Sequence, residues 1–285
     1  MSTTASSRPV DMLILGMGWS GTYVATLLTS LDISFEATTT TGRDGTLKFE
    51  YDPDSTDPTP FEQLPDAKTV LVTFPLRGKQ SALNLADLYE QTHASTAVTQ
   101  QYILLGSTRP YSTTAGDAGD VWVDRNSNPD LTIDAPRQEA EAALLARGGR
   151  GGRGSGCVLN LAGLYGGTRD PRNWVPRVAP DLPALRGKGS LHVIHGEDVA
   201  QAVLAVSRDF TPGERWLVTD TRVYCWWDLA AAWGDRDEAR WVLRLMEEAG
   251  VRGLPRPVEM LGRAVDSTAF WRRFGVVPLR PSLKP

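Results

Sequence analysis

The chain has 285 residues, enough for one large α/β domain or for a nucleotide-binding domain with a smaller cap. Its hydrophobic fraction of 41% and charged fraction of 22% are typical of a soluble globular protein. The net charge of −4 excludes a broad basic field for nucleic acid or for an anionic membrane surface. No apolar run approaches the roughly 20 residues that span a bilayer. We therefore expect neither a nucleic-acid partner nor a membrane.

The N-terminal residues and the cysteines indicate the compartment. Residues 1–9 lack the apolar core of a signal peptide, and we interpret residues 1–7 as a disordered lead-in. Cys157 and Cys225 are the only cysteines, and two cysteines do not make a disulfide framework. The sequence therefore predicts a reducing, cytoplasmic location.

Apolar segments typical of strands alternate along the chain with segments typical of helices. The predicted strands are residues 10–15, 33–39, 69–74, 102–106, 157–161, 191–195 and 215–219. The predicted helices are residues 20–31, 79–92, 135–147, 197–207, 226–233, 235–249 and 267–274. Residues 148–156 are rich in Gly and Arg, and their place between a helix and a strand favours a flexible connector over an RNA-binding segment. The alternation predicts an α/β fold with a doubly wound parallel sheet.

The first predicted strand is followed at once by Gly-x-Gly-x-x-Gly, at the point where a helix should begin. Its glycines are Gly16, Gly18 and Gly21, with Trp19 and Ser20 between the last two. Gly16 can take the tight turn, Gly18 lets the backbone approach a pyrophosphate, and Gly21 lets the helix pack against the strand. The helix N-terminus offers free N–H groups to the phosphates. The motif therefore predicts a dinucleotide site, with a ligand-free glycine turn as the alternative.

The residues after the second predicted strand bear on the choice between NAD and NADP. An NAD site usually has an acidic residue there, which binds the ribose 2′-hydroxyl. This chain has Thr38, Thr39 and Arg43, and hydroxyls with a positive charge suit a 2′-phosphate. We therefore predict NADP over NAD, with an ordinary solvated loop as the alternative. The residues expected over the cofactor at the next carboxyl edge are Thr73, Phe74 and Pro75.

Four segments, in this order, resemble the landmarks of the extended and atypical short-chain dehydrogenases/reductases, the group that includes NAD-dependent sugar epimerases and dehydratases. They are residues 16–21, 105–111, 160–166 and 193–200, and residues 266–278 are similar to the closing segment of that group. The resemblance runs through nearly the whole chain. It implies a Rossmann fold with a smaller C-terminal substrate lobe.

The same resemblance implies a division into domains. We expect a dinucleotide-binding domain at residues 8–165 and 191–220, and a substrate-binding lobe at residues 166–190 and 221–285. It also implies that Ala162 and Gly163 lie beside the cofactor. The group often dimerises through a four-helix contact, which makes a homodimer possible by analogy.

The catalytic residues are where this sequence departs from the group. Those enzymes use a Ser or Thr that hydrogen-bonds the substrate oxygen, a Tyr that transfers a proton, and a Lys four residues later that binds the ribose. Ser107 matches the first, but Ile133 stands at the Tyr position and Arg137 at the Lys position. Isoleucine cannot transfer a proton, whereas arginine keeps its charge and can still reach a ribose or phosphate.

Three residues are candidates for the missing proton donor. Tyr111 fits if its ring faces the cleft, and Tyr165 is open to the same interpretation, with packing as the alternative for both. Asp134 fits if burial raises its pKa, although we favour a helix N-cap there. We interpret His195 and Asp198 as structural. Three His and two scattered Cys predict no metal site.

Seven of the nine tryptophans lie after residue 170, in the half that supplies most of the substrate lobe in the resembling group. We expect most of them in the core and a few around a pocket for a bulky apolar or planar substrate. An arginine there would bind a carboxylate or phosphate. The predicted substrate-binding residues are Tyr165, Trp174, Trp226 or its neighbour Trp227, and Arg172, with Arg169 as the alternative to Arg172.

Two classes of function remain open at this point. The first is an atypical NADP-dependent, reductase-like enzyme on a bulky small molecule, with Ser107 orienting the substrate oxygen. The second keeps the nucleotide and loses the redox step, as a sensor similar to the nitrogen-metabolite-regulator-like proteins or as an isomerase or cyclase. We favour the first, and the tryptophan-rich lobe favours a small-molecule pocket over a protein-docking face.

Overall fold

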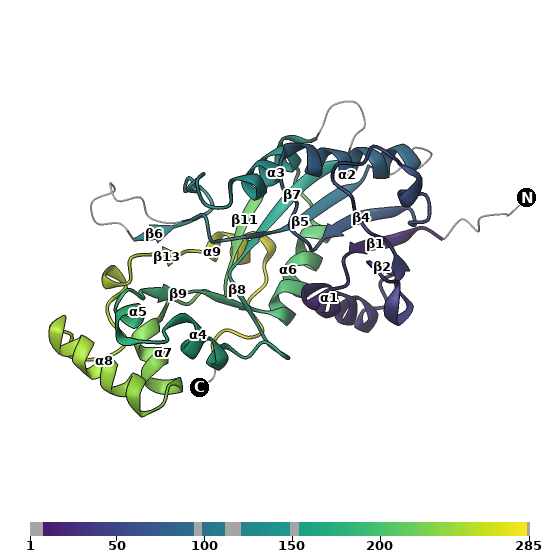
Figure 1. Ribbon diagram of the computed structural model, residues 1–285. Helices are drawn as coiled ribbons and strands as arrows, with labels where there is room; N and C mark the ends of the chain where they lie inside the picture. The colour runs from purple at the N-terminus through teal and green to yellow at the C-terminus, as the bar shows by residue number, and fades with distance from the viewer. Residues whose placement is uncertain (1–7, 94–98, 112–120, 149–153, 284–285) are drawn as a thin grey trace, which may run out of the picture. The chain divides into compact units, whose positions relative to one another are not determined.

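The computed structural model describes residues 8–93, 99–111, 121–148 and 154–283 (Figure 1). The predicted lead-in at residues 1–7 and residues 149–153 of the predicted connector lie outside the described part. The chain divides into two compact units. Unit 1 comprises Met1–Ser107, Leu131–Asn160 and Val199–Trp216, and unit 2 comprises Thr108–Asp130, Leu161–Asp198 and Leu217–Pro285.

A seven-stranded parallel sheet, built largely from unit 1, is the centre of the fold. Its strands are β1 (Val10–Leu15), β2 (Phe35–Thr39), β3 (Leu47–Lys48), β4 (Ala67–Val72), β5 (Gln101–Ser107), β7 (Ser155–Leu161) and β11 (Arg215–Val218). Their order is β11-β7-β5-β4-β1-β2-β3, so the direction of winding reverses between β1 and β4. The predicted α/β fold with a parallel, Rossmann-like sheet is confirmed.

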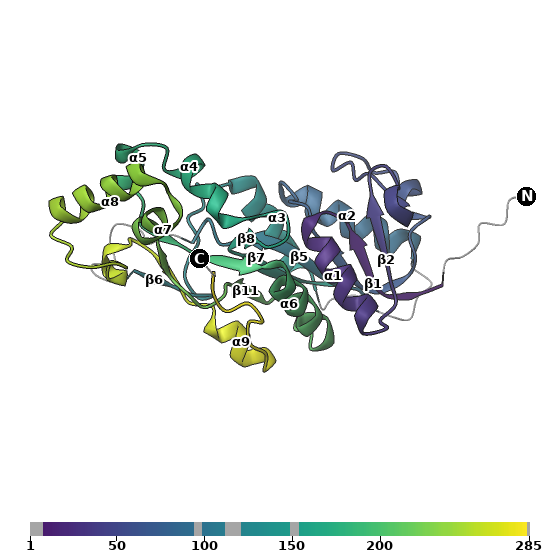
Figure 2. The same ribbon diagram turned by 90° about the horizontal axis from the view of Figure 1, so that it is seen from below.

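Helices cover both faces of this sheet, as the doubly wound prediction requires. They are α1 (Trp19–Ser30), α2 (Lys79–Thr92), α3 (Ala135–Ala146) and α6 (Gly196–Arg208). Figure 1 shows α2 and α3 over one face and α1 and α6 over the other, and Figure 2 shows the same arrangement from below. Side chains alternate along β1 because successive residues of a strand point to opposite faces. Leu13 and Leu15 join the core beneath α2 and α3, whereas Met12 and Ile14 are buried on the other face.

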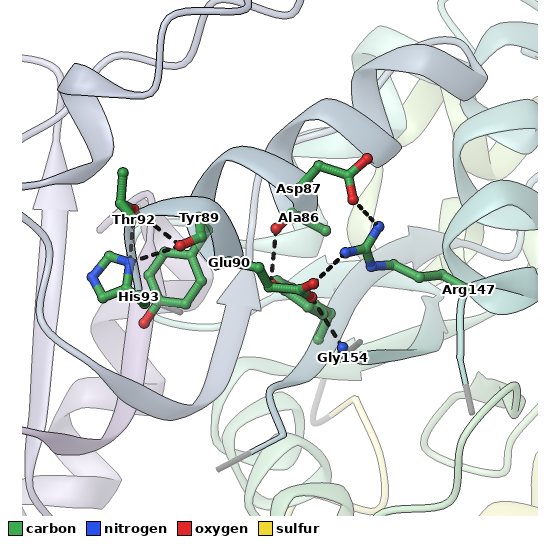
Figure 3. Close-up of polar contacts among 9 residues, drawn as sticks. Ala86, Asp87, Tyr89, Glu90, Thr92, His93, Arg147 and Gly154 are labelled. Atoms are coloured by element: carbon green, nitrogen blue, oxygen red, sulfur yellow. Dashed lines mark hydrogen bonds and ion pairs between the residues drawn. The ribbon is translucent and has the colours of Figure 1, made fainter. Parts of the chain in front are cut away.

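A buried arginine ties the end of α3 to α2 (Figure 3). Arg147 donates to Asp87 and to Glu90, at 2.7 Å each, and its side chain is almost fully buried. Glu90 in turn accepts from the Gly154 backbone N–H and from the Tyr102 hydroxyl. A buried charge is costly unless it is paired, so the Arg147 guanidinium has to stay beside these carboxylates. The network therefore links α3 to α2, the helix against which it packs.

Unit 2 is built from short elements around its own apolar core. Its strands are β6 (Trp122–Val123), β8 (Gly163–Tyr165), β9 (Ser190–Leu191), β10 (Val193–His195), β12 (Tyr224–Cys225) and β13 (Ala264–Val265). Its helices are α4 (Val175–Val178), α5 (Leu182–Arg186), α7 (Trp226–Trp233), α8 (Arg236–Glu248) and α9 (Thr268–Phe274). The short 3₁₀ helices found in the described residues of both units are η1 (Arg43–Gly45), η2 (Thr59–Phe61), η3 (Pro171–Trp174) and η4 (Val258–Met260). The core holds Trp226 and Trp227, with Trp233 and Trp241 packed against it, as expected for most of the tryptophans.

One predicted strand does not belong to the main sheet. Residues 191–195 form parts of β9 and β10, which pair with β12 and β8 in separate two-stranded sheets. The seventh place in the main sheet goes to β3, which is only two residues long and pairs in parallel with β2. The apolar run at residues 191–195 is buried within unit 2 instead. Its hydrophobicity thus correctly predicted burial, whereas its expected place in the main parallel sheet was wrong.

Within the part of the chain that the structure describes, no helix combines the length and the apolar composition needed to cross a membrane. The same described residues contain no group of three or more His, Cys, Asp or Glu side chains arranged to hold a metal ion.

Candidate functional site

The turn between β1 and α1 requires glycine at two of its three glycine positions. Gly16 has a positive φ of 93°, and a Cβ there would lie 2.7 Å from the Thr73 hydroxyl oxygen. A Cβ on Gly21 would lie 2.9 Å from the Gly16 carbonyl oxygen, so α1 approaches β1 this closely only with glycine. At Gly18, by contrast, no other described atom lies within 4 Å of the Cβ position. The fold itself therefore does not explain the second glycine.

Two threonines hold this turn, residues 16–18, in place. The Thr38 hydroxyl accepts the Gly16 N–H at 3.0 Å, and the Thr38 carbonyl accepts the Met17 N–H. The Thr73 hydroxyl donates to the Gly16 carbonyl at 2.6 Å. Thr38 is buried, so its predicted contact with the cofactor is replaced by a contact with the turn that would bind the cofactor.

The N-terminus of α1 fits a diphosphate. Gly18 is the N-cap residue, and among the described residues no side chain caps this end and no acidic residue lies in the first turn. Trp19 and Ser20 begin the helix, and Trp19 packs edge-on against Tyr23 with ring centroids 4.8 Å apart. An uncapped helix N-terminus presents backbone N–H groups and the positive end of the helix dipole to an anion. The open space at Gly18 is the approach that such an anion would need.

The residues after β2 form a turn that exposes an arginine. The Thr39 hydroxyl accepts the Arg43 N–H at 3.1 Å and lies 2.8 Å from the Thr46 hydroxyl oxygen. Gly42 and Asp44 have positive φ, which turns the chain back toward β3. The Arg43 side chain is 63% exposed, and its guanidinium lies 3.6 Å from the Asp44 carboxylate. Arg43 is thus a charged donor at the carboxyl edge of β2, available to an anionic ligand.

The predicted residues after β4 have different surroundings. Thr73 supports the glycine turn, as described above. Phe74 is half-buried and stacks on Tyr51 with centroids 6.2 Å apart. Pro75 is exposed. Phe74 and Pro75 lie at the carboxyl end of β4, beside the reversal between β1 and β4, where a dinucleotide is expected. Their contact with a cofactor stays a prediction.

The predicted catalytic region of unit 1 lies at the end of β5 and the start of α3. Ser107 is the last residue of β5 and is partly exposed. Ile133, at the position of the missing tyrosine, is partly exposed, and its carbonyl accepts from the Gln138 side chain. Asp134 occupies the N-cap position with φ 53°, but its carboxylate pairs with Arg77 at 2.9 Å and makes no capping bond. The prediction that Asp134 caps α3 through its side chain is therefore wrong, because the left-handed backbone turns the carboxylate elsewhere.

Arg137 is anchored at the same edge of the sheet. One terminal nitrogen, Nη2, donates to the Leu105 carbonyl of β5 at 2.9 Å. Its Nε lies 3.5 Å from Oε1 of Glu141, one helical turn further along α3. The guanidinium thus lies next to the strand that carries Ser107.

Glu141 is a site residue that the sequence reasoning missed. It is 3% exposed, and burial raises the pKa of its carboxyl, while Asn160, Arg215 and Arg137 oppose that rise. Its Oε2 accepts from the Asn160 amide at 2.9 Å and lies 3.4 Å from the Arg215 guanidinium. The i,i+4 spacing of Arg137 and Glu141 on a predicted helix was the available signal.

A cavity of about 600 Å³ lies within unit 2. We call it the tryptophan cavity, and its lining residues are Gly163, Leu164, Thr168, Arg169, Asp170, Asn173, Trp174, Arg177, Val178, Leu191 and Trp226. Two of the predicted substrate-binding residues, Trp174 and Trp226, are among them. Arg172 is not among them; its guanidinium donates hydrogen bonds to both carboxylate oxygens of Asp170, which lower the pKa of that carboxyl. The basic residues of the cavity are Arg169, the alternative named above, and Arg177, which the sequence did not single out.

Tyr165 lies at a different cavity of unit 2, of about 490 Å³, lined by Tyr165, His195 and residues 279–282. Its hydroxyl donates to the carbonyls of Arg280 and Ser282, and burial raises the pKa of the phenol. Asp198 accepts the backbone N–H groups of Leu279 and Arg280, consistent with the structural role expected of it. The predicted substrate-binding set is therefore divided between two cavities and one surface ion pair.

The remaining predicted residues lie in unit 2. Tyr111 is 1% exposed and belongs to an apolar cluster with Val123, Leu217 and Val265, which favours the packing interpretation over a proton donor. Ala162 is buried. The Gly163 N–H donates to the His192 carbonyl, and Gly163 lines the tryptophan cavity.

Solved structures resemble this chain along nearly its whole length, although no family model and no curated protein matches it. A putative NAD-dependent epimerase/dehydratase from Methylobacillus flagellatus has 16% identity and a TM-score of 0.62, covering 96% of this chain and 94% of that one. MoeE5 in complex with UDP-glucose and NAD has 17% identity and a TM-score of 0.62, covering 94% and 93%.

A third similar structure is the dTDP-glucose 4,6-dehydratase of Bacillus anthracis in complex with NAD. It has 11% identity and a TM-score of 0.59, and the match covers 95% of this chain and 92% of the other. Structural neighbours across the full chain are thus NAD-dependent epimerase/dehydratase proteins, and the resemblance inferred from the sequence is confirmed at the level of fold.

Proposed function

We propose that this chain, whose fold is that of the NAD-dependent epimerases and dehydratases, binds NADP and acts as an atypical reductase-like enzyme. The observation that carries the proposal is the turn at residues 16–18. Gly16 and Gly21 are required by the backbone, whereas glycine at Gly18 leaves open space before an uncapped helix N-terminus. A diphosphate explains that space, because its oxygens accept the free N–H groups of the first turn of α1.

Arg43 and Thr39 support NADP as the preferred cofactor. Arg43 is exposed at the carboxyl edge of β2, and Thr39 holds its backbone. A guanidinium binds a phosphate through charge-assisted hydrogen bonds, which a ribose hydroxyl does not match. MoeE5 and the dTDP-glucose dehydratase were solved with NAD. These complexes support a dinucleotide as the cofactor, and the preference for NADP rests on Arg43 and Thr39.

Two residues of unit 1, Ser107 and Arg137, have proposed roles in the reaction. The bound cofactor would supply or accept the hydride. Ser107, at the end of β5, would donate a hydrogen bond to the substrate oxygen, and Arg137 would hold the cofactor near that strand. Ile133 cannot move a proton, so the proton comes from water, from the substrate or from a group outside the usual position.

The tryptophan cavity is the proposed place of the substrate. Trp174 and Trp226 offer aromatic faces to a planar group. Arg177 adds positive charge to the lining, which favours an anionic group, and the acidic residue of the lining, Asp170, is paired with Arg172. We propose a bulky, planar small molecule with a carboxylate or phosphate as the substrate class.

A second candidate function keeps the nucleotide and omits the redox step. Ile133 in place of the tyrosine and the burial of Tyr111 favour it. In that case the protein is a nucleotide sensor, or an isomerase or cyclase in which the cavity supplies shape and hydrogen bonds. NADPH oxidation by the purified protein across a panel of aromatic carbonyl acids separates the two candidates. Consumption that falls on Ser107→Ala supports the reductase, and its absence with every carbonyl supports the second candidate.

Titration of the purified protein with NADPH and NADH, followed by tryptophan fluorescence and calorimetry, tests the binding proposal. Gly18→Val should bind NADPH at least about tenfold more weakly, since its side chain fills the approach of the diphosphate. Gly253→Val is the matched control, because a Cβ at Gly253 also meets no described atom within 4 Å and it lies in unit 2. Silence of the wild-type protein toward both dinucleotides, or equal affinity in Gly18→Val, would overturn the proposal.

A further inference from the structure

The buried carboxylate of Glu141 has two sides with different neighbours. Its Oε1 faces Arg137, at 3.5 Å from Nε, and its Oε2 faces Asn160 and Arg215. All four residues lie in unit 1. The contact on the Oε1 side is thus separable from the contacts on the Oε2 side, and the two sides can be disturbed one at a time.

Room for this cluster is made by a glycine in β5. A Cβ on Gly106 would lie 2.7 Å from Oε1 of Glu141 and 2.3 Å from the Asn160 amide nitrogen. Glycine at position 106, next to the end of β5, therefore leaves the space in which the Glu141 carboxylate is buried. A buried ion pair is rarely more stable than an apolar pair of the same volume, so stability alone is a weak reason for this arrangement.

Orientation of Arg137 is the stronger reason. Its Nη2 is held by the Leu105 carbonyl and its Nε by Glu141, and these two anchors fix the plane of the guanidinium. Among the described residues, the structure gives its remaining terminal nitrogen, Nη1, no hydrogen-bond partner. A guanidinium fixed on two of its nitrogens presents the third to a ligand with little loss of rotational freedom.

The strand to which Arg137 is anchored indicates which half of a bound dinucleotide it would contact. A dinucleotide lies across the reversal between β1 and β4, with one half on each side. The glycine turn and Arg43 belong to the β1–β2 side, whereas Arg137 is anchored to β5, on the β4 side. Arg137 therefore corresponds to the nicotinamide half and Arg43 to the adenosine half.

We propose that Glu141 is a positioning residue, which aims Arg137 at the nicotinamide half of the bound dinucleotide. The proposal rests on the proposed function, since it presumes that a dinucleotide binds. It goes beyond it by assigning a buried carboxylate, remote from the glycine motif, a selective effect on one half of the ligand.

Two ligands separate this effect from a general loss of folding. NADPH contains both halves, whereas 2′,5′-ADP contains only the adenosine half with its 2′-phosphate. Glu141→Gln, which keeps the volume and removes the charge, should weaken NADPH about tenfold and leave 2′,5′-ADP unchanged, both measured by calorimetry. Arg137→Met should show the same selective loss. Arg215→Met removes a contact of the Oε2 side and leaves the contact between Arg137 and Oε1 in place, so it is the matched control and should leave both affinities unchanged.

The double variant Arg137→Met/Glu141→Gln tests whether Glu141 acts through Arg137. It should bind NADPH no more weakly than Arg137→Met alone, because the two changes remove one shared contact. Additive losses in the double variant, or a Glu141→Gln protein that loses both ligands equally, would overturn the positioning role. If Glu141→Gln does not fold, Glu141→Asp takes its place, since its shorter side chain keeps the charge and withdraws Oε1 from Arg137. Failure of the proposed function is distinct, because the wild-type protein would then bind neither ligand.

Discussion

Two buried groups of unit 2 should give the stability of this protein opposite dependences on pH. Burial lowers the pKa of the His192 imidazole to about 3, and its Nε2 accepts the Val265 N–H at 2.9 Å. Burial raises the pKa of the Asp220 carboxyl to about 7, although the Tyr224 hydroxyl and the Arg222 N–H both donate to it. Each group is thus neutral in the folded protein over most of the range between pH 4 and pH 6.

The sign follows from which state binds the proton more tightly. His192 has an unfolded pKa of 6.5, so its neutral form stabilises the folded state above that value, and this stability is lost as pH falls from about 6.5 toward about 3. Asp220 has an unfolded pKa of 3.8, so the folded state holds its proton longer, and stability is lost as pH rises from about 4 to about 7. Each contribution changes by roughly 1.4 kcal/mol per pH unit and by about 4–5 kcal/mol over its whole window.

In the wild-type protein the contributions of His192 and Asp220 change the free energy of unfolding in opposite directions with pH, and they nearly cancel between about pH 4.5 and pH 6.5. Variants that remove one group at a time should reveal each contribution. Urea unfolding followed by tryptophan fluorescence at half-unit steps over about that range gives the free energy of unfolding. Relative to wild type, His192→Gln should become less stable as pH rises, and Asp220→Asn should become more stable as pH rises. Gln and Asn can still accept the Val265 and Arg222 N–H groups, so the folded contacts are kept. Differences from wild type that do not change with pH would refute the reasoning for the group concerned.

Three further predictions concern unit 1. Gly21→Ala should lower the free energy of unfolding by about 1–3 kcal/mol, because its Cβ would lie 2.9 Å from a carbonyl oxygen, whereas Gly18→Ala should lower it by nothing measurable; equal melting temperatures would contradict this. Arg43→Ala should weaken NADPH by about tenfold and NADH hardly at all in fluorescence titrations, and equal losses would remove the 2′-phosphate assignment. Arg147→Met should cost about 1.5–3 kcal/mol in urea unfolding, because it removes the charge-assisted hydrogen bonds to Asp87 and Glu90, and a loss below about 1 kcal/mol would show that these two contacts contribute little.

The parts of the fold that the sequence predicted are those with a strong local signal. Strands β1, β4 and β5 are apolar runs buried on both faces, and Gly16 needs its positive φ whatever surrounds it. Strand β3 has only two residues, too few for any period, and it exists because Leu47 pairs with Thr38. Burial of residues 191–195 was predictable, but not their partners, because pairing depends on which edge is free in the folded chain.

The site shows the same division between local and tertiary signals. The glycine motif specifies its own turn, since the steric demands of Gly16 and Gly21 arise within a few residues or from the adjacent strand. Asp134 looked like an N-cap from its neighbours, and a distant arginine, Arg77, takes its carboxylate. Arg172 was predicted to bind an anion, but Asp170 pairs with it, and the basic residues that line the cavity are Arg169 and Arg177. Ion-pair competition of this kind is decided by side-chain geometry that no sequence pattern encodes.

The absence of a tyrosine at position 133 restricts the reactions that this site can perform more than it restricts binding. The hydroxyl of Tyr165 is engaged by backbone carbonyls, and its pKa is raised by burial, while Tyr111 lies within an apolar cluster. Neither phenol is therefore poised to replace the missing one. The residues proposed to hold the cofactor, by contrast, are themselves supported by neighbouring side chains: Thr38 and Thr73 hydrogen-bond the glycine turn, and Glu141 lies 3.5 Å from Arg137. If the proposed cofactor contacts hold, a site without the usual tyrosine suits a reaction whose proton exchange occurs with water, or a ligand that is bound without being turned over. NADPH consumption distinguishes these outcomes, because it occurs only in the first, and its pH profile would then lack the ionisation that a catalytic phenol would impose.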